Sequence, residues 1–364
     1  MEKVKVSVMF MSYNHGAYIR QAMDSVLRQT FRNYEVILSD DCSCDNTKEM
    51  LSGYQDSRIT MHFFEENQGA VMNCRYIWQH CQGEYLALIN SDDVWLPEHL
   101  EKSVDYMDAH PECGAVFSWA ATIDEEDRII DPCCDVFRQP NRSQAEWIHH
   151  LFTKGNCLCH PSMVIRREVY DTVGFYKSGF RQLPDFNMWT RMVNHYPLHI
   201  LEEVLVYHRR CIHTNQNTSA PLVENSIRDV NESLCTLFQY FENMPDRLFL
   251  EAFGKEFRNR KAEAPAELLC EKFFLMYDEK YYMHGIARFM AFIYLHGIYD
   301  EQDVKEILKN QYGFTLKDFH ELGAETDFLG LKKRPIMPED VALRSKNAVS
   351  KILFWKKGTG KTII

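Results

Sequence analysis

Residues 4–14 (VKVSVMFMSYN), 34–41 (YEVILSDD) and 85–93 (YLALINSDD) share one pattern. Each is a short apolar run, rich in β-branched and large side chains, that ends in polar residues, as a strand of a buried sheet does. Between the first two runs, apolar residues recur at helical spacing from Tyr18 to Leu27. Strands that alternate with helices of about 10–15 residues predict βαβ units and a mainly parallel sheet flanked by helices.

The rest of the chain divides into regions of different pattern. We expect helices over residues 46–55 and 70–81, a strand over 59–64, and shorter mixed elements from 113 to 210. From about residue 223 the pattern is mostly helical, and it includes further helices over the two ranges 281–299 and 300–310. The first of these two contains His284, Arg288 and His296, which favours a buried helix over a membrane span. The expected organisation is an α/β domain over 1–220, a helical region over 221–330 and a basic tail over 331–364.

Composition excludes several classes of protein. The 364 residues are 45% hydrophobic and 26% charged, which excludes a largely disordered or low-complexity chain. A formal net charge of −11 argues against a nucleic-acid partner, because such binding needs a basic surface. The twelve cysteines form no CxxC pair, so we expect most to be small buried hydrophobes in a reducing cytosol. No signal peptide is visible at the N-terminus, so the expected location is cytoplasmic.

Asp92 and Asp93 directly follow an apolar strand. Two adjacent carboxylates repel each other unless a cation lies close to them. Carboxylate oxygens suit Mg²⁺ or Mn²⁺, which share their coordination shell with the phosphates of a substrate. The alternative is a solvated turn or a helix N-cap, since Leu96 and Pro97 open the next helix.

A second acidic pair, Asp40 and Asp41, follows an earlier strand. A carboxylate there can accept the imide N–H of uracil or thymine, or ribose hydroxyls. The alternative is again a turn, with an N-cap at Asp45 or Asn46. Because ligands bind at the carboxyl ends of parallel strands, two acidic strand ends in one α/β unit favour a nucleotide diphosphate site.

Taken in order, these motifs resemble family 2 glycosyltransferases. The resemblance covers roughly residues 4–220, and its motifs are residues 6–14 (VSVMFMSYN), 18–31 (YIRQAMDSVLRQTF), 34–41, 67–69 (NQG), 83–85 (GEY), 90–93 (NSDD), 185–191 (DFNMWTR) and 207–219. It implies a GT-A fold and an inverting transfer from a nucleoside-diphosphate sugar, either a UDP- or a dTDP-sugar, assisted by Mn²⁺ or Mg²⁺.

The resemblance also implies roles for individual residues on the donor side. Tyr13 would stack on the base, and Asp41 would hydrogen-bond it. Arg75 would lie near the diphosphate or the base. Asp92 would serve the ribose and the metal shell, and Asp93 would be the direct metal ligand.

On the acceptor side, Asp185 matches the general base of the family. His213 matches a histidine near the diphosphate or the metal, in a loop that is one residue longer than the common form. Asn90 and Pro184 stand where family members usually have acidic residues. We expect Trp189 to pack in the core or under the acceptor site.

The expected function is therefore an inverting glycosyltransferase of cell-surface glycan synthesis. Its acceptor hydroxyl would belong to a glycan, a glycolipid or a protein. A nucleotidyltransferase and a non-catalytic nucleotide-sugar-binding protein are the alternatives that the α/β pattern and the acidic strand ends leave open.

The tail from Leu331 carries nine Lys and Arg against one Glu and one Asp. One side, at helical spacing, carries Val341, Ser345, Ala348, Val349, Ile352 and Leu353, with Arg344, Lys346 and Lys351 at its edges. Such a helix can lie in a membrane interface, so peripheral contact with the inner membrane face is one expectation. The alternatives are a helix docked on the acidic body of the protein and a disordered tail.

Overall fold

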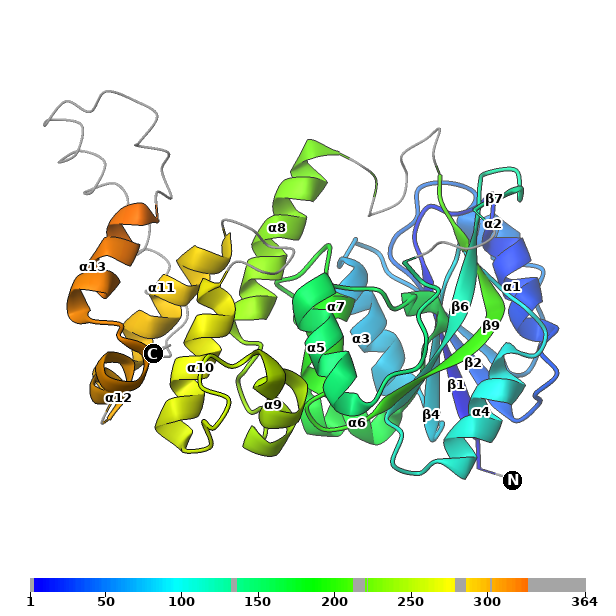
Figure 1. Cartoon of the computed structure of the whole chain (residues 1–364). Helices are drawn as coiled ribbons and strands as arrows, with labels where there is room; N and C mark the ends of the chain where they lie inside the picture. The colour runs from blue at the N-terminus through cyan, green and yellow to red at the C-terminus, as the bar shows by residue number, and fades with distance from the viewer. Residues whose placement is uncertain are drawn as a thin grey trace, which may run out of the picture. The chain divides into compact units, whose positions relative to one another are not determined.

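The computed structural model describes residues 3–131, 136–211, 220, 222–278, 286–301 and 303–326 (Figure 1). The chain forms two compact units, Met1–Ala252 and Phe253–Ile364. The basic tail over 331–364 and His213 lie outside the described residues.

The described part of the first unit contains a nine-stranded sheet with the order β3-β2-β1-β4-β8-β6-β9-β5, and β7 pairs with β6. The longer pairings, β1 with β2 and β4 and β6 with β9, are parallel, whereas β5, β7 and β8 pair antiparallel. The strands are β1 (Val6–Ser12), β2 (Tyr34–Asp40), β3 (Ile59–Phe63), β4 (Tyr85–Asn90), β5 (Val94–Trp95), β6 (Ala115–Ile123), β7 (Ile129–Asp131), β8 (Val164–Arg166) and β9 (Leu198–Arg209).

Helices cover both faces of this sheet. The helices of this part of the chain are α1 (Ile19–Leu27), α2 (Thr47–Leu51), α3 (Ala70–His80), α4 (His99–Ala109), α5 (Gln144–Lys154), the 3₁₀ helix η1 (His160–Ser162), α6 (Arg167–Val173), α7 (Pro184–Met192), α8 (Val223–Phe238) and α9 (Asp246–Phe253), of which α8 and α9 lie away from the strands (Figure 1). Alternate residues of β1, such as Val8 and Phe10, share one core with α1 and α4. Helix α3 packs on β1 and β2, on the other face (Figure 1). Burial on both faces explains why β1 is apolar throughout and does not alternate.

The sheet curls on itself. Strands β4 and β5 are joined by only three residues, 91–93, yet they lie far apart in the strand order. Three residues cannot bridge a flat sheet, because each extended residue spans at most about 3.6 Å. The helix η1 contacts β4, β6 and β9, and the Nε1 of Trp95 on β5 donates to the carbonyl oxygen of Pro161 at 2.7 Å.

The α/β fold that the sequence predicts is confirmed, and most element bounds are within two residues of expectation. Helix α2 is an exception, because it ends at Leu51 and not near residue 55. The Ser52 hydroxyl and N–H both bond to the Glu49 carbonyl oxygen, and Gly53 follows. Trp189 is fully buried, as expected, and seven of the ten described cysteines are buried. The first unit extends to Ala252 and includes α8, whereas the boundary expected at residue 220 stays a prediction.

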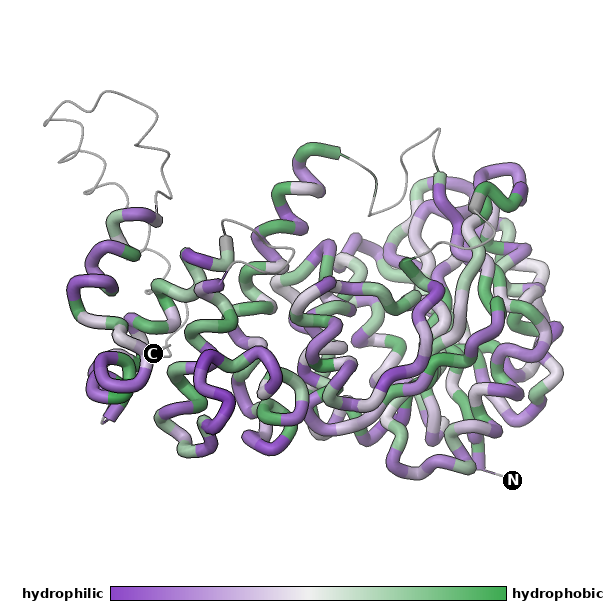
Figure 2. The backbone as a smooth tube through the Cα atoms, in the orientation of Figure 1, coloured by the Kyte–Doolittle hydropathy of each residue, from purple (hydrophilic) through white to green (hydrophobic). Residues whose placement is uncertain are grey.

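The described part of the second unit is helical. After the 3₁₀ helix η2 (Gly254–Glu256) come α10 (Pro265–Tyr277), α11 (Ile286–Ile298), α12 (Val304–Tyr312) and α13 (Leu316–Glu325). Helix α10 is largely hydrophobic (Figure 2), and it packs against α11 and α12. Glu271 is buried there and accepts the N–H groups of Arg258 and Asn259 and the Tyr312 hydroxyl. Among the described residues, no helix has both the length and the apolar character needed to cross a membrane.

Candidate active site

The carboxyl ends of β1, β2 and β4 meet at one edge of the sheet. Ser12 pairs with Asp40, and Met11 pairs with Asn90, so the residues that follow all three strands are neighbours. Tyr13 follows β1 at this edge with 45% of its side chain exposed. An exposed ring at a strand end is free to stack on a flat ligand.

The two acids that follow β2 make different contacts. Asp40 builds the loop: its Oδ1 accepts the hydroxyls of Ser12 and Ser43 at 2.9 and 2.6 Å, and its Oδ2 accepts the Ser43 N–H. Asp41 accepts the N–H groups of Gln68 and Gly69, at 2.7 and 2.9 Å, just before α3. Asp40 therefore stabilises a turn, as the alternative interpretation of this acidic pair predicts. Asp41 is buried and ordered by the start of α3, and each of its oxygens can accept one more bond.

Gly69 makes this contact possible. It has a φ of +84°, a conformation that residues with a side chain rarely adopt, and its N–H donates to Asp41 in this conformation. The Asn-Gln-Gly segment before α3 thus orients the carboxylate.

The acidic pair between β4 and β5 is buried. Asp92 and Asp93 are 6% and 1% exposed. The Oδ1 of Asp93 accepts the Arg209 N–H at 2.9 Å, and its Oδ2 accepts the side-chain amide of Asn90 at 3.0 Å. Burial, followed by the charge of Asp92, raises the pKa of Asp93 well above its ordinary value, although these hydrogen bonds oppose the shift. A buried acidic pair of this kind favours a nearby cation.

His15 borders the same pair. Its Nδ1 lies 2.8 Å from the Ser91 Oγ and 3.7 Å from the Asp92 Oδ1. Within the described ranges, no three or more His, Cys, Asp or Glu side chains are grouped so that they could hold a metal.

Arg75 lies on α3, facing the segment that follows α6. Its Nη2 donates to the Tyr176 carbonyl oxygen at 3.3 Å, and its guanidinium lies 5.5 Å from the Phe175 ring centroid. Its buried Nε has no hydrogen-bond partner. The predicted contact of Arg75 with a diphosphate or a base stays a prediction.

Asp185 stands in the first turn of α7, after Pro184. Its Oδ1 accepts the Phe186 N–H at 2.7 Å, and its Oδ2 accepts the side-chain amide of Asn156 at 2.9 Å. Asn156 follows α5 and supplies a neutral partner on the Oδ2 side. Helix N-terminal position and hydrogen bonding both suit a carboxylate.

Three titratable groups interact with the charge of Asp185. Burial lowers the pKa of His160, whose Nε2 lies 2.9 Å from the Tyr176 hydroxyl, while Asp185 opposes this shift. Burial, with a smaller contribution from Asp185, raises the pKa of Tyr176 well above its ordinary value. Burial, then Glu232 and Asp185, raises the pKa of Asp229 on α8.

Two residues at these sites were missed by sequence reasoning. Asn156 and Arg209 touch the predicted catalytic and metal-binding carboxylates directly. Neither stands in a local pattern that marks such a role, since both act across the fold.

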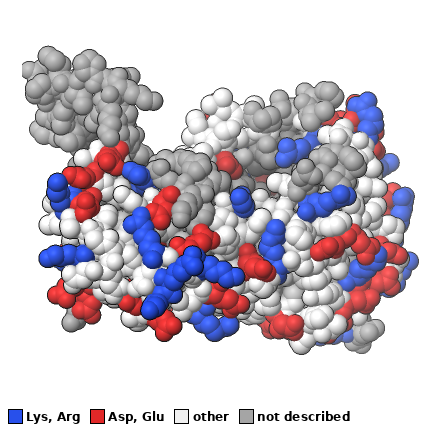
Figure 3. Space-filling view, in the orientation of Figure 1, with Lys and Arg blue, Asp and Glu red and all other residues white. Residues whose placement is uncertain are grey.

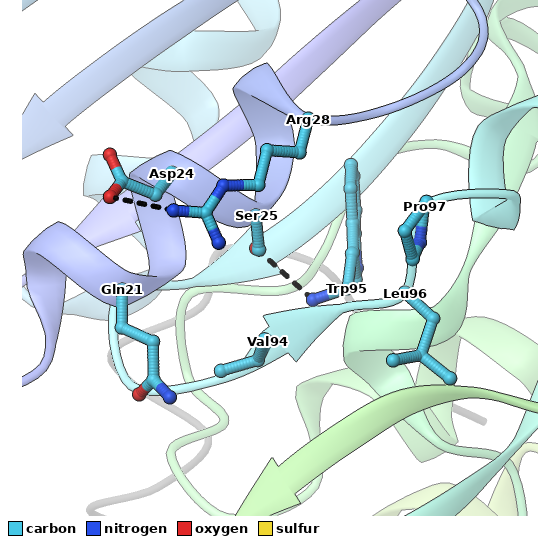
Figure 4. A pocket seen from close by; sticks show the side chains of 8 residues that line it. All are labelled: Gln21, Asp24, Ser25, Arg28, Val94, Trp95, Leu96 and Pro97. Atoms are coloured by element: carbon cyan, nitrogen blue, oxygen red, sulfur yellow. Dashed lines mark hydrogen bonds and ion pairs between the residues drawn. The ribbon is translucent and has the colours of Figure 1, made fainter.

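A cavity of about 450 Å³ lies elsewhere, between α1 and β5 (Figure 4). Across it, the Ser25 hydroxyl accepts the Trp95 N–H at 3.1 Å, and Arg28 pairs with Asp24. None of the predicted site residues lines it. Its lining residues are Gln21, Asp24, Ser25, Arg28, Val94, Trp95, Leu96 and Pro97.

On the face drawn in Figure 3, basic and acidic side chains are interspersed.

Comparison with known proteins agrees with this geometry. Residues 7–174 match the family model described as Glycosyl transferase family 2, a range that runs from β1 through α6. The fold and this match define the chain as a glycosyltransferase with a GT-A fold. Over residues 7–174, the chain is similar to glycosyl transferase family 2.

Known proteins are similar to part of the chain. An uncharacterized glycosyltransferase of Methanocaldococcus jannaschii is 28% identical over 214 residues, which are 57% of this chain and 72% of the relative. The putative teichuronic acid biosynthesis glycosyltransferase TuaG of Bacillus subtilis is 40% identical over 107 residues, 29% of this chain and 42% of TuaG. Among solved structures, S. aureus TarS 1-349 in complex with UDP-GlcNAc superposes with a TM-score of 0.54 at 16% identity, over 85% of this chain and 92% of that one.

Proposed function

We propose that this glycosyltransferase moves a sugar from a UDP- or dTDP-sugar to an acceptor hydroxyl with inversion at the anomeric carbon. The observation that carries the proposal is the buried pair Asp92 and Asp93, at the sheet edge that also bears Tyr13 and Asp41. The proposed acceptor is a glycan, a glycolipid or a protein in cell-surface glycan synthesis, and the proposed location is the cytoplasm. Membrane contact through residues 331–364 stays a prediction.

The donor would lie along the carboxyl ends of β1, β2 and β4. Tyr13 is exposed there and would stack on the base, while Asp41 would accept the imide N–H of uracil or thymine with its remaining lone pairs. UDP-GlcNAc bound to TarS, which shares this fold, favours UDP over dTDP as the nucleotide. The name of TuaG refers to teichuronic acid biosynthesis, which favours a glycan acceptor.

The acidic pair fits a divalent cation. Each oxygen of Asp93 accepts one hydrogen bond and keeps a lone pair, and burial, followed by the charge of Asp92, raises the pKa of this carboxyl. Asp93, with Asp92, would hold Mg²⁺ or Mn²⁺, which bind one or two carboxylates together with substrate phosphates. When bound, the cation would supply Lewis-acid stabilisation of the leaving diphosphate. His213, the other expected ligand, lies outside the described residues.

Asp185 would act as the general base. In an inverting transfer, the acceptor oxygen bonds to the anomeric carbon while the bond to the diphosphate breaks on the opposite face. The hydroxyl proton passes to a carboxylate, a contribution of about 10²–10⁴-fold to the rate. Asp185 lies in the first turn of α7, whereas the acidic pair follows β4, so the proposed base and metal site come from different segments, as this geometry requires.

The first test measures ligand stabilisation. UDP with Mn²⁺, at 100 times its dissociation constant, should stabilise the protein by about 2.7 kcal/mol. We expect a smaller shift with UDP alone and none with Mn²⁺ and GDP, in thermal melts of the full chain. The same samples, supplied with UDP-sugars, are assayed for UDP release. Binding without any release under all acceptors would favour a non-catalytic sensor, and pyrophosphate release from UTP would favour a nucleotidyltransferase.

A second prediction concerns Asn156. Asn156→Asp places a carboxylate 2.9 Å from the Asp185 Oδ2. Two charges at this distance repel, so the pair retains a proton to higher pH than a single carboxylate does. Because the base must be ionised, the acid limb of the kcat/KM profile should move to higher pH. Asn156→Ser, which adds no charge, is the control and should leave the limb in place; an unmoved limb in Asn156→Asp contradicts the role of Asp185.

A further inference from the structure

Arg209, the last residue of β9, is fully buried, although arginine is normally a surface residue. Its side chain touches three separate segments of the first unit. In the turn between β6 and β7, Nη1 donates to the Asp124 carbonyl oxygen at 2.5 Å and Nη2 to the Asp127 carboxylate at 2.6 Å. On α1, Nη2 donates to the Gln21 Oε1 at 2.7 Å, and the guanidinium lies 4.5 Å from the Tyr18 ring centroid.

The third segment is the acidic pair itself. The Nε of Arg209 donates to the Asp92 carbonyl oxygen at 2.9 Å, and its backbone N–H donates to the Asp93 Oδ1 at 2.9 Å. One residue thus holds the backbone of the first acid and a carboxylate oxygen of the second. Neither contact occupies the carboxylate of Asp92 or the Oδ2 of Asp93.

The chemistry of the guanidinium suits this position. Its planar fork presents donors in several fixed directions, and it keeps its charge at all physiological pH values. A lysine ammonium cannot reach Asp92, the β6–β7 turn and Gln21 together, because its three donors radiate from a single atom. The positive charge also lies beside two buried carboxylates that repel each other.

We propose that Arg209 is a positioning residue, which orients Asp92 and Asp93 for a divalent cation and the donor diphosphate. The inference rests on the proposed function, because it assumes that the acidic pair binds the metal. It further links that orientation to the β6–β7 turn and α1, which contribute Asp127 and Gln21 to the same guanidinium. Residues that orient metal ligands typically change metal affinity by 10–100-fold when they are replaced.

A purely structural role is the competing explanation, and Arg166 provides the matched control. Arg166 is also buried, at 9% exposure, and it donates to the carbonyl oxygens of Cys113, Met107 and His110. It pairs with Tyr85 at the amino end of β4, the opposite end from the acidic pair. Replacing either arginine by lysine removes a buried guanidinium, but only the guanidinium of Arg209 contacts the acidic pair, at the Asp92 carbonyl oxygen.

The experiment compares Arg209→Lys and Arg166→Lys in the full chain. Both should lower the melting temperature. The dissociation constant of Mn²⁺, measured by electron paramagnetic resonance in the presence of saturating UDP, should rise about 10–100-fold in Arg209→Lys. It should stay unchanged in Arg166→Lys. An unchanged constant in folded Arg209→Lys, or an equal rise in both variants, overturns the proposal.

If Arg209→Lys does not fold, the exposed residues that accept hydrogen bonds from Arg209 provide a second test. Asp127 is 54% exposed and Gln21 is exposed, so the double variant Asp127→Asn/Gln21→Ala should fold. This variant weakens the two hydrogen bonds of the Arg209 Nη2, so the dissociation constant of Mn²⁺ should rise, but by less than in Arg209→Lys. An unchanged dissociation constant overturns the proposal. Failure of the wild type to bind Mn²⁺ would instead refute the proposed metal site. Mn²⁺ binding that Asp93→Ala abolishes and Arg209→Lys leaves unchanged would refute only the role of Arg209.

Discussion

Asp185→Asn is expected to lower turnover by about two to four orders of magnitude while donor binding survives. The asparagine keeps the size of the carboxylate and can still accept the Phe186 N–H, so the start of α7 is preserved. Asn156 can rotate its amide to accept from the new side chain. What the variant lacks is the capacity to take the proton of the acceptor hydroxyl.

The measurement pairs initial rates of UDP release with the dissociation constant for UDP. Asp229→Asn is the matched control, because Asp229 is a carboxylate on α8 whose charge interacts with that of Asp185. It should retain most of the wild-type turnover, which separates loss of the base from loss of nearby negative charge. Near-normal turnover in Asp185→Asn would move the base to another residue.

Asp93→Asn should abolish the Mn²⁺ dependence of UDP binding. The asparagine can accept the Arg209 N–H in place of the carboxylate, but it carries no charge to offer a cation. Asp93→Ala should have the same effect on binding and a larger effect on stability. It leaves the buried donors of Asn90 and Arg209 without that acceptor, at a cost of about 1–3 kcal/mol.

Titration calorimetry with UDP at several Mn²⁺ concentrations provides the readout. Asp108→Asn is the control, since Asp108 on α4 accepts from Lys5 and the Tyr85 hydroxyl, at the amino end of β4. That variant should lose stability and keep the metal dependence of the wild type. UDP binding with unchanged metal dependence in Asp93→Asn would show that the acidic pair is not the metal site.

The elements of the first ninety residues could be predicted from the sequence because their signals are local. Runs such as Val6–Ser12 and Tyr85–Asn90 are buried on both faces, so their apolar character is continuous and their ends are polar. The parallel pairing that brings these ends together follows from the helices between them. The expected position of the nucleotide site rests on this local information.

Contacts between distant residues could not be predicted in this way. Arg209 bonds to Gln21, Asp92 and Asp127, none of which is near it in sequence. The same holds for two pairings of the curled sheet, which join strands distant in sequence. Strand β8 lies antiparallel between β4 and β6, and β5 pairs with β9.

Adjacent residues with identical side chains pose a related difficulty. Asp40 and Asp41 cannot be told apart by type, and only their neighbours decide which one builds the loop. Ser43 bonds to Asp40, while the N–H groups before α3 reach Asp41. At Asp185, the partner Asn156 comes from a segment 29 residues earlier.

The short connection between β4 and β5 has a consequence for how the site comes into being. Strand β5 is held in place by its pairing with β9. The four residue steps from Asn90 to Val94 span at most about 14 Å, so the segment that carries the acidic pair must be nearly fixed in position. During synthesis, residues 7–174 emerge with both acids present but without the strand that fixes them. The contacts that hold the two acids include those of residue 209, at the end of β9. The arrangement of the acidic pair is therefore a result of sheet closure and not a property of the segment that carries the acids.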